Sequence, residues 1–157
     1  MSFGTEYSYL FNTPKMIPLT KDSMNQAMHL VQNFEANMGD TLIYPALKAC
    51  YDCLLDKGGN ETAQQIFVLT DGAVMNIREI VELAGLQKHL AEVHTFGLGE
   101  CSSPGLIIEL AEITGGTYNF VLKHDNTLNS KIVASIQQAS RPNLIRSKVS
   151  MALFDDS

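Results

Sequence analysis

An aspartate directly follows an apolar run near the middle of the chain. Residues 65–70 read QIFVLT, a pattern typical of a buried strand, and Asp71 and Gly72 come immediately after them. A carboxylate at a strand exit can close a turn, cap the following helix, or hold a cation or a partner. From spacing alone, an Asp-Gly pair more commonly closes a turn or caps a helix, so the groups that the fold brings beside it decide its chemistry.

Further oxygen ligands lie at positions that a parallel sheet would bring to the same edge. Asp40 and Thr41 precede a predicted helix, and Asp71 ends a predicted strand. Ligands of open parallel sheets bind beyond the carboxyl ends of the strands. Carboxylate and hydroxyl oxygens suit Mg²⁺ better than zinc. We therefore place the metal positions at Asp40, Thr41 and Asp71, and the partner-contacting positions at Gly39, Gly72, Gly99 and Glu100.

The sequence offers little for catalysis. The stretch GLGECSSPG, residues 97–105, lacks the spacing of a G-x-G-x-x-G loop, and no lysine-bearing phosphate loop occurs. Cys101 could be a nucleophile, but no motif ties a histidine to it. His94 lies inside a predicted strand and is expected to be a hydrogen-bonded core residue. We therefore predict that the protein is not an enzyme.

Strands and helices alternate from residue 65 onward. Strands are predicted at QIFVLT, EVHTFGLG and TYNFVL, and apolar residues recur at helical spacing between them. Ser103-Pro104 and Gly115-Gly116 mark the two ends of one helix. This order predicts an α/β fold, a doubly wound and mostly parallel sheet with helices on both faces, truncated at its N-terminus. We place the domain at residues 1–142 and a C-terminal strand and tail at residues 143–157.

Two segments carry sulfur-containing side chains at helical spacing. From Thr20 on, the pattern predicts a helix whose apolar face fills a core, although a methionine-rich face can also be an adaptable binding surface. That face consists of Met24, Ala27, Met28, Val31 and Phe34. In KACYDCLL, Cys50 and Cys53 form a C-x-x-C pair with no second pair and no histidine cluster. Buried helix cysteines are therefore favoured over a zinc or redox site.

Charge and composition narrow the partners and the compartment. A net charge of −6 argues against nucleic acid or an anionic membrane, because both favour a basic surface. No apolar run approaches the ~20 residues that cross a bilayer, so no membrane insertion is expected. The N-terminus MSFGTEYSYLF has no signal-peptide pattern. Three cysteines suit a reducing compartment. These features predict an intracellular, cytoplasmic protein.

Taken together and in order, several segments resemble a von Willebrand factor type A domain. FVLTDG is similar to that family's strand ending in threonine-aspartate-glycine, and MGDTLIYPAL to its glycine-rich loop with a metal-site threonine. VHTFGLGE and LIIELAEITGGTYNFV are similar to the elements that follow, and SFGTEYSYLF to the segment after the second strand. The tail ASRPNLIRSKVSMALF is similar to the intracellular and inter-alpha-trypsin-inhibitor heavy-chain type. The resemblance implies a protein-binding module whose cation accepts a carboxylate from the partner.

The resemblance also implies an incomplete metal site. Thr41 and Asp71 match two positions of the metal-ion-dependent adhesion site, and Asp40 replaces the family's second glycine. The family's other ligands come from an aspartate-x-serine-x-serine motif after its first strand, and this sequence lacks that motif. We therefore expect weak or absent Mg²⁺ binding by the chain alone. The missing central strand leaves three alternatives: a fragment, a swapped homodimer, or a structural subunit whose sheet a neighbouring chain completes without metal.

Overall fold

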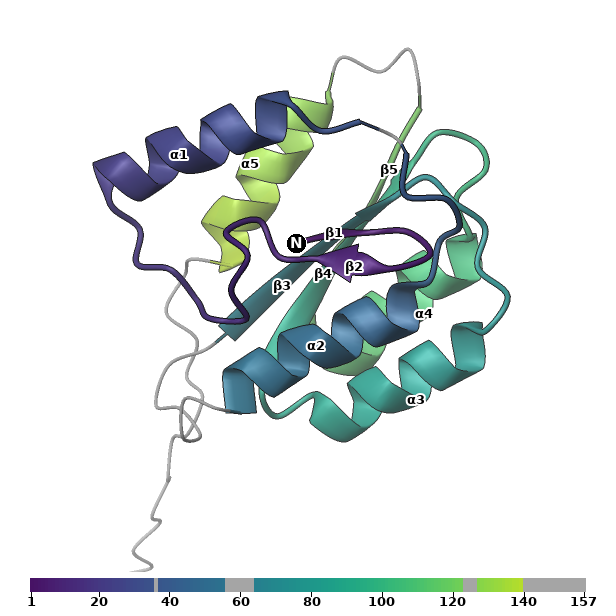
Figure 1. Ribbon diagram of the computed structural model, residues 1–157. Coiled ribbons are helices and arrows are strands. Elements are labelled where there is room, and N and C mark those ends of the chain that lie inside the picture. The colour runs from purple at the N-terminus through teal and green to yellow at the C-terminus, as the bar shows by residue number, and fades with distance from the viewer. Residues whose placement is uncertain (36, 56–63, 123–126, 140–157) are drawn as a thin grey trace, which may run out of the picture.

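The computed structural model describes residues 1–35, 37–55, 64–122 and 127–139 (Figure 1). The predicted strand and tail at 143–157 lie outside these residues, so the boundary at residue 142 stays a prediction. None of the described helices is long and apolar enough to cross a membrane. The described elements are β1 (Ser2–Phe3), β2 (Tyr7–Ser8), α1 (Lys21–Gln32), α2 (Ile43–Leu55), β3 (Gln64–Thr70), α3 (Ile77–Gln87), β4 (Ala91–Leu98), α4 (Pro104–Thr114), β5 (Tyr118–Val121) and α5 (Leu128–Ala139).

The main sheet has three parallel strands in the order β3-β4-β5. The register places Val68 beside Thr95, and Thr95 beside Tyr118. Figure 1 shows α2, α3 and α4 on one side of this sheet and α1 and α5 on the other. The predicted α/β fold with a parallel sheet is therefore confirmed, with the described sheet narrower than a full doubly wound one.

One face of the sheet carries the main core. Val68 and Val93 project from this face and pack with apolar residues of α2, α3 and α4. Leu106 and Leu110 of α4 and Ile80 of α3 are fully buried there. The Thr95 hydroxyl donates a hydrogen bond of 2.6 Å to the Ile107 carbonyl, which fixes α4 on β4. This face gives the strands a rigid base, so the loops at their carboxyl ends start from fixed positions.

The predicted helix ends are mostly confirmed. Thr20 caps α1 through a reciprocal hydrogen-bond pair with Ser23, because the hydroxyl and backbone groups of each residue face one another there. Pro104 is the first residue of α4, and Gly115 ends that helix with a φ of 80°, the left-handed conformation that glycine adopts at no steric cost. Ser103 precedes α4 but makes no capping hydrogen bond, and its hydroxyl instead accepts from the Val74 N–H.

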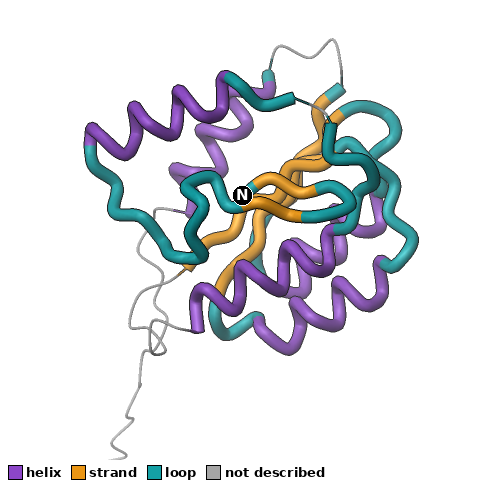
Figure 2. Tube along the Cα trace, viewed as in Figure 1, coloured by secondary structure: helices purple, strands orange, loops and turns teal. Residues whose placement is uncertain are grey.

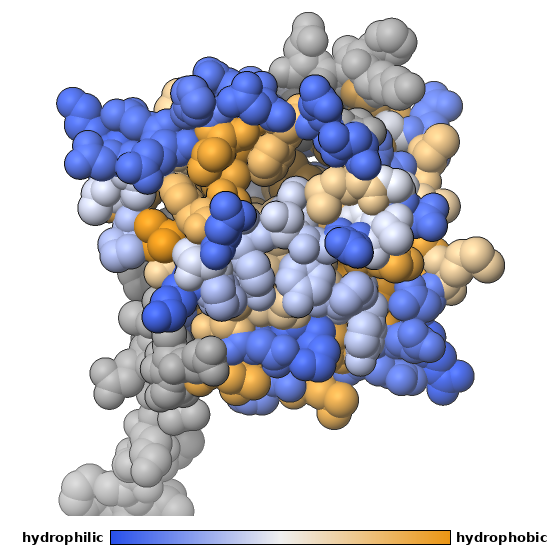
Figure 3. Space-filling view, viewed as in Figure 1, coloured by the Kyte–Doolittle hydropathy of each residue, from blue (hydrophilic) through white to orange (hydrophobic). Residues whose placement is uncertain are grey.

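The prediction that α1 fills a core is wrong. The helix forms as expected, but none of its residues is buried, and Met24, Met28, Val31 and Phe34 are each about half exposed. Figure 3 shows apolar residues gathered between α1 and the N-terminal hairpin. Hydrophobic periodicity identifies an apolar face but not what covers it. In the described part of the chain the sheet ends at β3, so no further strand packs against α1.

The N-terminal segment forms a small hairpin. β1 and β2 pair antiparallel, with Ser2 opposite Ser8 and Phe3 opposite Tyr7, and they form a sheet of their own (Figure 2). Strands of two residues are too short to leave a recognisable period in a sequence. The turn of this hairpin positions the first loop of the candidate site.

Candidate functional site

The loop that carries Asp40 and Thr41 is held by the turn of the N-terminal hairpin. The Thr5 N–H donates to the Met38 carbonyl at 2.7 Å, and the Thr5 hydroxyl accepts from the Asp40 N–H at 3.0 Å. The Leu42 N–H donates to the Gly4 carbonyl at 3.0 Å. These bonds join residues more than thirty positions apart and hold the loop on both sides of Asp40. The loop therefore enters α2 in one conformation.

Thr41 lies against the loop that follows β3. A methyl group placed on Gly72 would overlap the Thr41 hydroxyl oxygen and come within 2.9 Å of Thr41 Cβ. Only a residue without a side chain allows this approach. The structure therefore brings Thr41 beside the Asp71-Gly72 pair, although the two lie thirty residues apart, and this juxtaposition is the one that the strand-exit rule predicts.

The third loop, after β4, adjoins the same edge. Gly99 has a φ of 73°, and its N–H donates to the Val121 carbonyl of β5 at 2.7 Å. Glu100 next to it is exposed, as is Cys101. The Ser103 hydroxyl accepts from the Val74 N–H at 2.9 Å, and this bond ties the loop after β3 to the start of α4. Ser103 and Thr5 were not predicted as site residues, because nothing local in the sequence signals their long-range hydrogen bonds.

The oxygen atoms at this edge do not by themselves make a complete magnesium site. Asp40 and Asp71 are exposed, and Thr41 is half-buried. Among the described residues, no three His, Cys, Asp or Glu side chains converge on a point. Mg²⁺ demands near-octahedral coordination by six oxygens. With one oxygen from each, two carboxylates and one hydroxyl would supply three of these six, and waters would have to fill the rest.

His94 lies on the other face of the sheet and is a satisfied core histidine, as predicted. Its Nδ1 accepts from the Thr117 N–H at 3.1 Å, so the ring proton lies on Nε2, which contacts the Gln65 amide oxygen at 2.5 Å. Burial lowers the pKa of His94, and the nearby Glu92 carboxylate opposes that shift. Protonation of Nδ1 would also remove the acceptor of the Thr117 N–H. The residue thus joins β3 and β4 to the start of β5.

Cys50 and Cys53 were predicted to be buried, and both are only half-buried free thiols on α2. The Cys50 sulfur lies 3.9 Å from the Met1 sulfur, and the Cys53 sulfur lies 3.7 Å from the Tyr9 hydroxyl oxygen. Burial raises the pKa of the Cys50 thiol. The reason for the incomplete burial is that α2 faces the open side of β3, where no further described strand packs.

The fold and this edge together define a class of protein. They describe an α/β domain whose loops at the carboxyl ends of parallel strands form a compact, acidic edge. A family model described as von Willebrand factor type A domain matches residues 1–120. The chain belongs to the von Willebrand factor type A domain family.

Curated relatives carry the same domain name. A von Willebrand factor A domain-containing protein of Dictyostelium discoideum is 24% identical over 98% of this chain. The von Willebrand factor A domain-containing proteins 5A of Mus musculus and Homo sapiens are 30% and 28% identical over 87% and 89% of it. The match covers 16%, 16% and 17% of the three relatives, respectively, so this chain corresponds to a small part of each. A solved structure of a membrane-spanning protein from Vibrio fischeri aligns at a TM-score of 0.38 with 18% identity, covering 78% of this chain and 68% of its own.

Proposed function

We propose that the chain is a non-enzymatic protein-binding module of the von Willebrand factor type A kind, and that it binds through the loops at the carboxyl ends of β3 and β4. The observation that carries this proposal is the contact between Thr41 and Gly72, which holds two loops from distant parts of the sequence at one edge. Around that contact, Asp40, Asp71 and Glu100 are exposed and acidic. Rigid loops that present exposed charge are suited to recognising a protein surface.

The metal site of this edge is proposed to be degenerate. Asp40, Thr41 and Asp71 offer oxygens, and Mg²⁺ would supply a positive charge to bridge them to a partner carboxylate. With so few protein ligands, the chain alone is expected to bind Mg²⁺ weakly or not at all. Calorimetric titration with MgCl₂ tests this: tight binding that is lost in Asp71→Ala would contradict it.

The protein-binding role is tested by comparing what three immobilised forms retain from an extract. The forms are the wild type, the double variant Asp40→Ala/Asp71→Ala, and the control Glu79→Ala/Glu82→Ala, which removes two exposed carboxylates from α3. We expect at least one protein to bind the wild type and the control but not the Asp40/Asp71 variant. Retention of the same proteins by all three forms would contradict binding through this edge.

A second candidate function is a structural subunit whose sheet a neighbouring chain completes, without metal. The specific observations in its favour are the unpaired side of β3 among the described strands and the exposed apolar face of α1. Light scattering after size exclusion, combined with urea unfolding, tests it. A stable monomer that unfolds cooperatively would contradict this candidate.

An intracellular, cytoplasmic location is proposed as well, and its support is chemical. All three cysteines are free in the structure, and Cys101 is exposed. Exposed free thiols persist best in a reducing compartment. Imaging of a tagged full-length protein would test this, and accumulation in the secretory pathway would contradict it.

A further inference from the structure

The buried ring of His94 ties the start of β5 to the other two strands of the sheet. The Thr117 N–H donates to His94 Nδ1 at 3.1 Å, and the Thr117 hydroxyl oxygen lies 2.9 Å from the same nitrogen. The Thr117 carbonyl accepts from the Thr95 N–H of β4 at 2.9 Å. On the other side of the ring, Nε2 contacts the Gln65 amide oxygen of β3. One imidazole ring therefore joins all three strands, and the protonation of Nδ1 decides whether the Thr117 N–H has an acceptor.

The far end of β5 is tied to the candidate binding edge. The Gly99 N–H donates to the carbonyl of Val121, the last residue of β5, at 2.7 Å. Gly99 precedes Glu100, one of the exposed acidic residues of that edge. β5 has only four residues, and β4 is its one neighbour among the described strands. Because so short a strand has few other bonds to fix it, a change at Thr117 reaches Gly99 through the length of β5.

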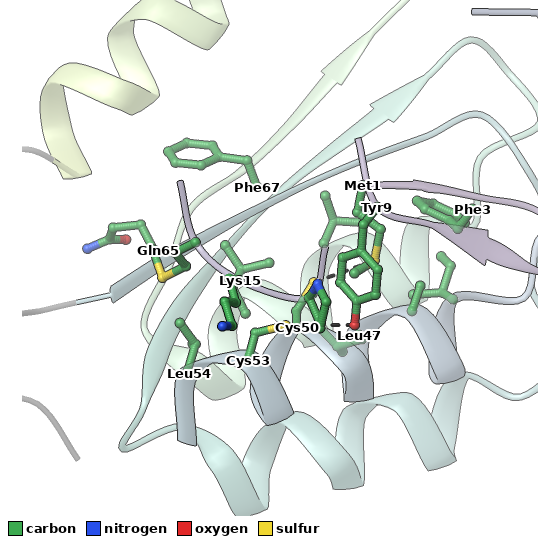
Figure 4. A pocket seen from close by; sticks show the side chains of 16 residues that line it. Met1, Phe3, Tyr9, Lys15, Leu47, Cys50, Cys53, Leu54, Gln65 and Phe67 are labelled. Atoms are coloured by element: carbon green, nitrogen blue, oxygen red, sulfur yellow. Dashed lines mark hydrogen bonds between the residues drawn. The ribbon is translucent and has the colours of Figure 1, made fainter. Parts of the chain in front are cut away.

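The surroundings of the His94 ring favour its neutral form. The residue is only 2% exposed, and Phe67, on the side of β3 away from α2 (Figure 4), stacks on it at a centroid distance of 4.9 Å. Burial lowers the pKa of His94, and the Glu92 carboxylate, 4.0 Å from Nε2, opposes that shift. α5 carries one charged side chain, Lys131, whose ammonium donates to the Phe120 carbonyl at 2.7 Å. α1, on the same side of the sheet, buries none of its residues.

A proton on Nδ1 breaks the bond between His94 and the Thr117 backbone. The charged ring carries a proton on both nitrogens, so the Thr117 hydroxyl can still accept from Nδ1 but the Thr117 N–H loses its acceptor. A buried donor without an acceptor is costly. If the start of β5 moves away, the ring reaches water and holds the proton with an ordinary pKa of about 6.5. The loosened state therefore binds the proton more tightly than the tied state, and falling pH favours it.

We propose that protonation of His94 releases the start of β5 and, through the bond between Val121 and Gly99, loosens the loop at residues 99–103, so that acid weakens partner binding at this edge. The core face of the sheet, which packs against α2, α3 and α4, stays folded during this change. This inference rests on the proposed protein-binding function and adds a pH-dependent control of the same site.

The Gly99 amide reports this change directly, because its proton makes the bond to Val121. Hydrogen–deuterium exchange of the full chain is followed by NMR at pH 7.5 and pH 5.5 and expressed as protection factors, which removes the intrinsic pH dependence of exchange. We expect protection of Gly99 and of β5 to fall by about three- to ten-fold at pH 5.5, because a loosened ring with a pKa of about 6.5 is protonated roughly ten to one there. Protection of α4 amides such as Leu110 should not change.

Two variants assign the change to one ring. His94→Gln has a side chain that does not titrate, so the protection of Gly99 should be the same at both pH values. The triple variant His29→Gln/His89→Gln/His124→Gln leaves His94 as the only histidine and should keep the full change. Its single imidazole signal can be titrated by NMR, and the midpoint of that titration should coincide with the midpoint of the Gly99 change. The triple variant therefore tests the proposal even if His94→Gln does not fold.

Three results would overturn the proposal. The first is unchanged protection of Gly99 in the wild type, and the second is an equal fall in α4 and β5, which would make His94 a determinant of global stability only. The third concerns the protein that binds the wild type but not the Asp40→Ala/Asp71→Ala variant. Its affinity should fall by about three- to ten-fold at pH 5.5 for the wild type and the triple variant but not for His94→Gln. Equal affinity at both pH values would overturn the control by pH and leave the proposed function standing, whereas absence of any such protein at either pH would refute both.

Discussion

The contact between Thr41 and Gly72 predicts a specific cost for adding one methyl group. In Gly72→Ala, the new Cβ would overlap the Thr41 hydroxyl and lie 2.9 Å from Thr41 Cβ, so one of the two loops must shift. The Thr41 loop is held on both sides by the hairpin turn and cannot move freely. Overpacking of this kind destabilises by about 1–3 kcal/mol. With an m-value of about 2 kcal/mol/M, the urea midpoint should fall by roughly 0.5–1.5 M.

The same reasoning requires that removing the Thr41 side chain restores the space. In a double-mutant cycle of Gly72→Ala with Thr41→Gly, we expect a coupling energy of about 1 kcal/mol or more, with the double variant more stable than the sum of the single effects allows. Gly105→Ala is the control, because its new Cβ would have no neighbour closer than 3.8 Å and alanine favours the helix. An unchanged midpoint in Gly72→Ala, or no rescue by Thr41→Gly, would refute the proximity of the two loops.

Two further predictions concern stability. Because burial lowers the pKa of His94 below its ordinary value of about 6.5, the unfolded chain binds a proton first as the pH falls. The free energy of unfolding should therefore be highest above pH ~6.5 and decrease below it. Urea unfolding across this range gives the slope of that decrease, which His94→Gln should reduce by up to about 1.4 kcal/mol per pH unit. The control His89→Gln, at an exposed position, should keep the slope of the wild type. An unchanged slope in His94→Gln would count against the buried neutral ring. Leu110 is fully buried between α4 and the sheet, so Leu110→Ala should cost about 2–5 kcal/mol in urea unfolding. Leu86→Ala, at a 75% exposed position, should stay within about 0.5 kcal/mol, and similar midpoints for the two would place Leu110 outside the core.

Much of the fold follows from local patterns in the sequence. The run QIFVLT forms a strand, as its short run of branched and aromatic apolar residues indicates, although Phe67 and Leu69 on one of its faces stay exposed. Pro104 and Gly115 mark the ends of α4 because each has a backbone preference that suits only that end of a helix. These signals depend on residues close together in the chain, and a single sequence contains them.

What the sequence did not reveal depends on contacts between distant residues. The apolar face of α1 was correctly identified, but its burial depended on a neighbour, and Met24 and Met28 are exposed because the described sheet does not extend to them. Thr5 holds Asp40 across a separation of 35 residues, and a threonine near the N-terminus gives no sign of that role. Within the candidate site, the structure places Thr41 against Gly72. The metal and partner assignments remain predictions for all the residues named for them, namely Asp40, Thr41, Asp71, Gly39, Gly72, Gly99 and Glu100.

Hydrogen–deuterium exchange of the full chain tests the proposed binding edge most directly. It is measured with and without the partner protein, the one that binds the wild type but not the Asp40→Ala/Asp71→Ala variant. Residues 39–42 lie in the loop before α2, and residues 71–76 and 99–103 lie in the loops after β3 and β4. Binding at this edge predicts that their exchange slows when the partner is present, while exchange on the outer surface of α3 is unchanged. Slowed exchange confined to α3 or α1, with those loops unaffected, would contradict the assignment of this edge as the binding surface.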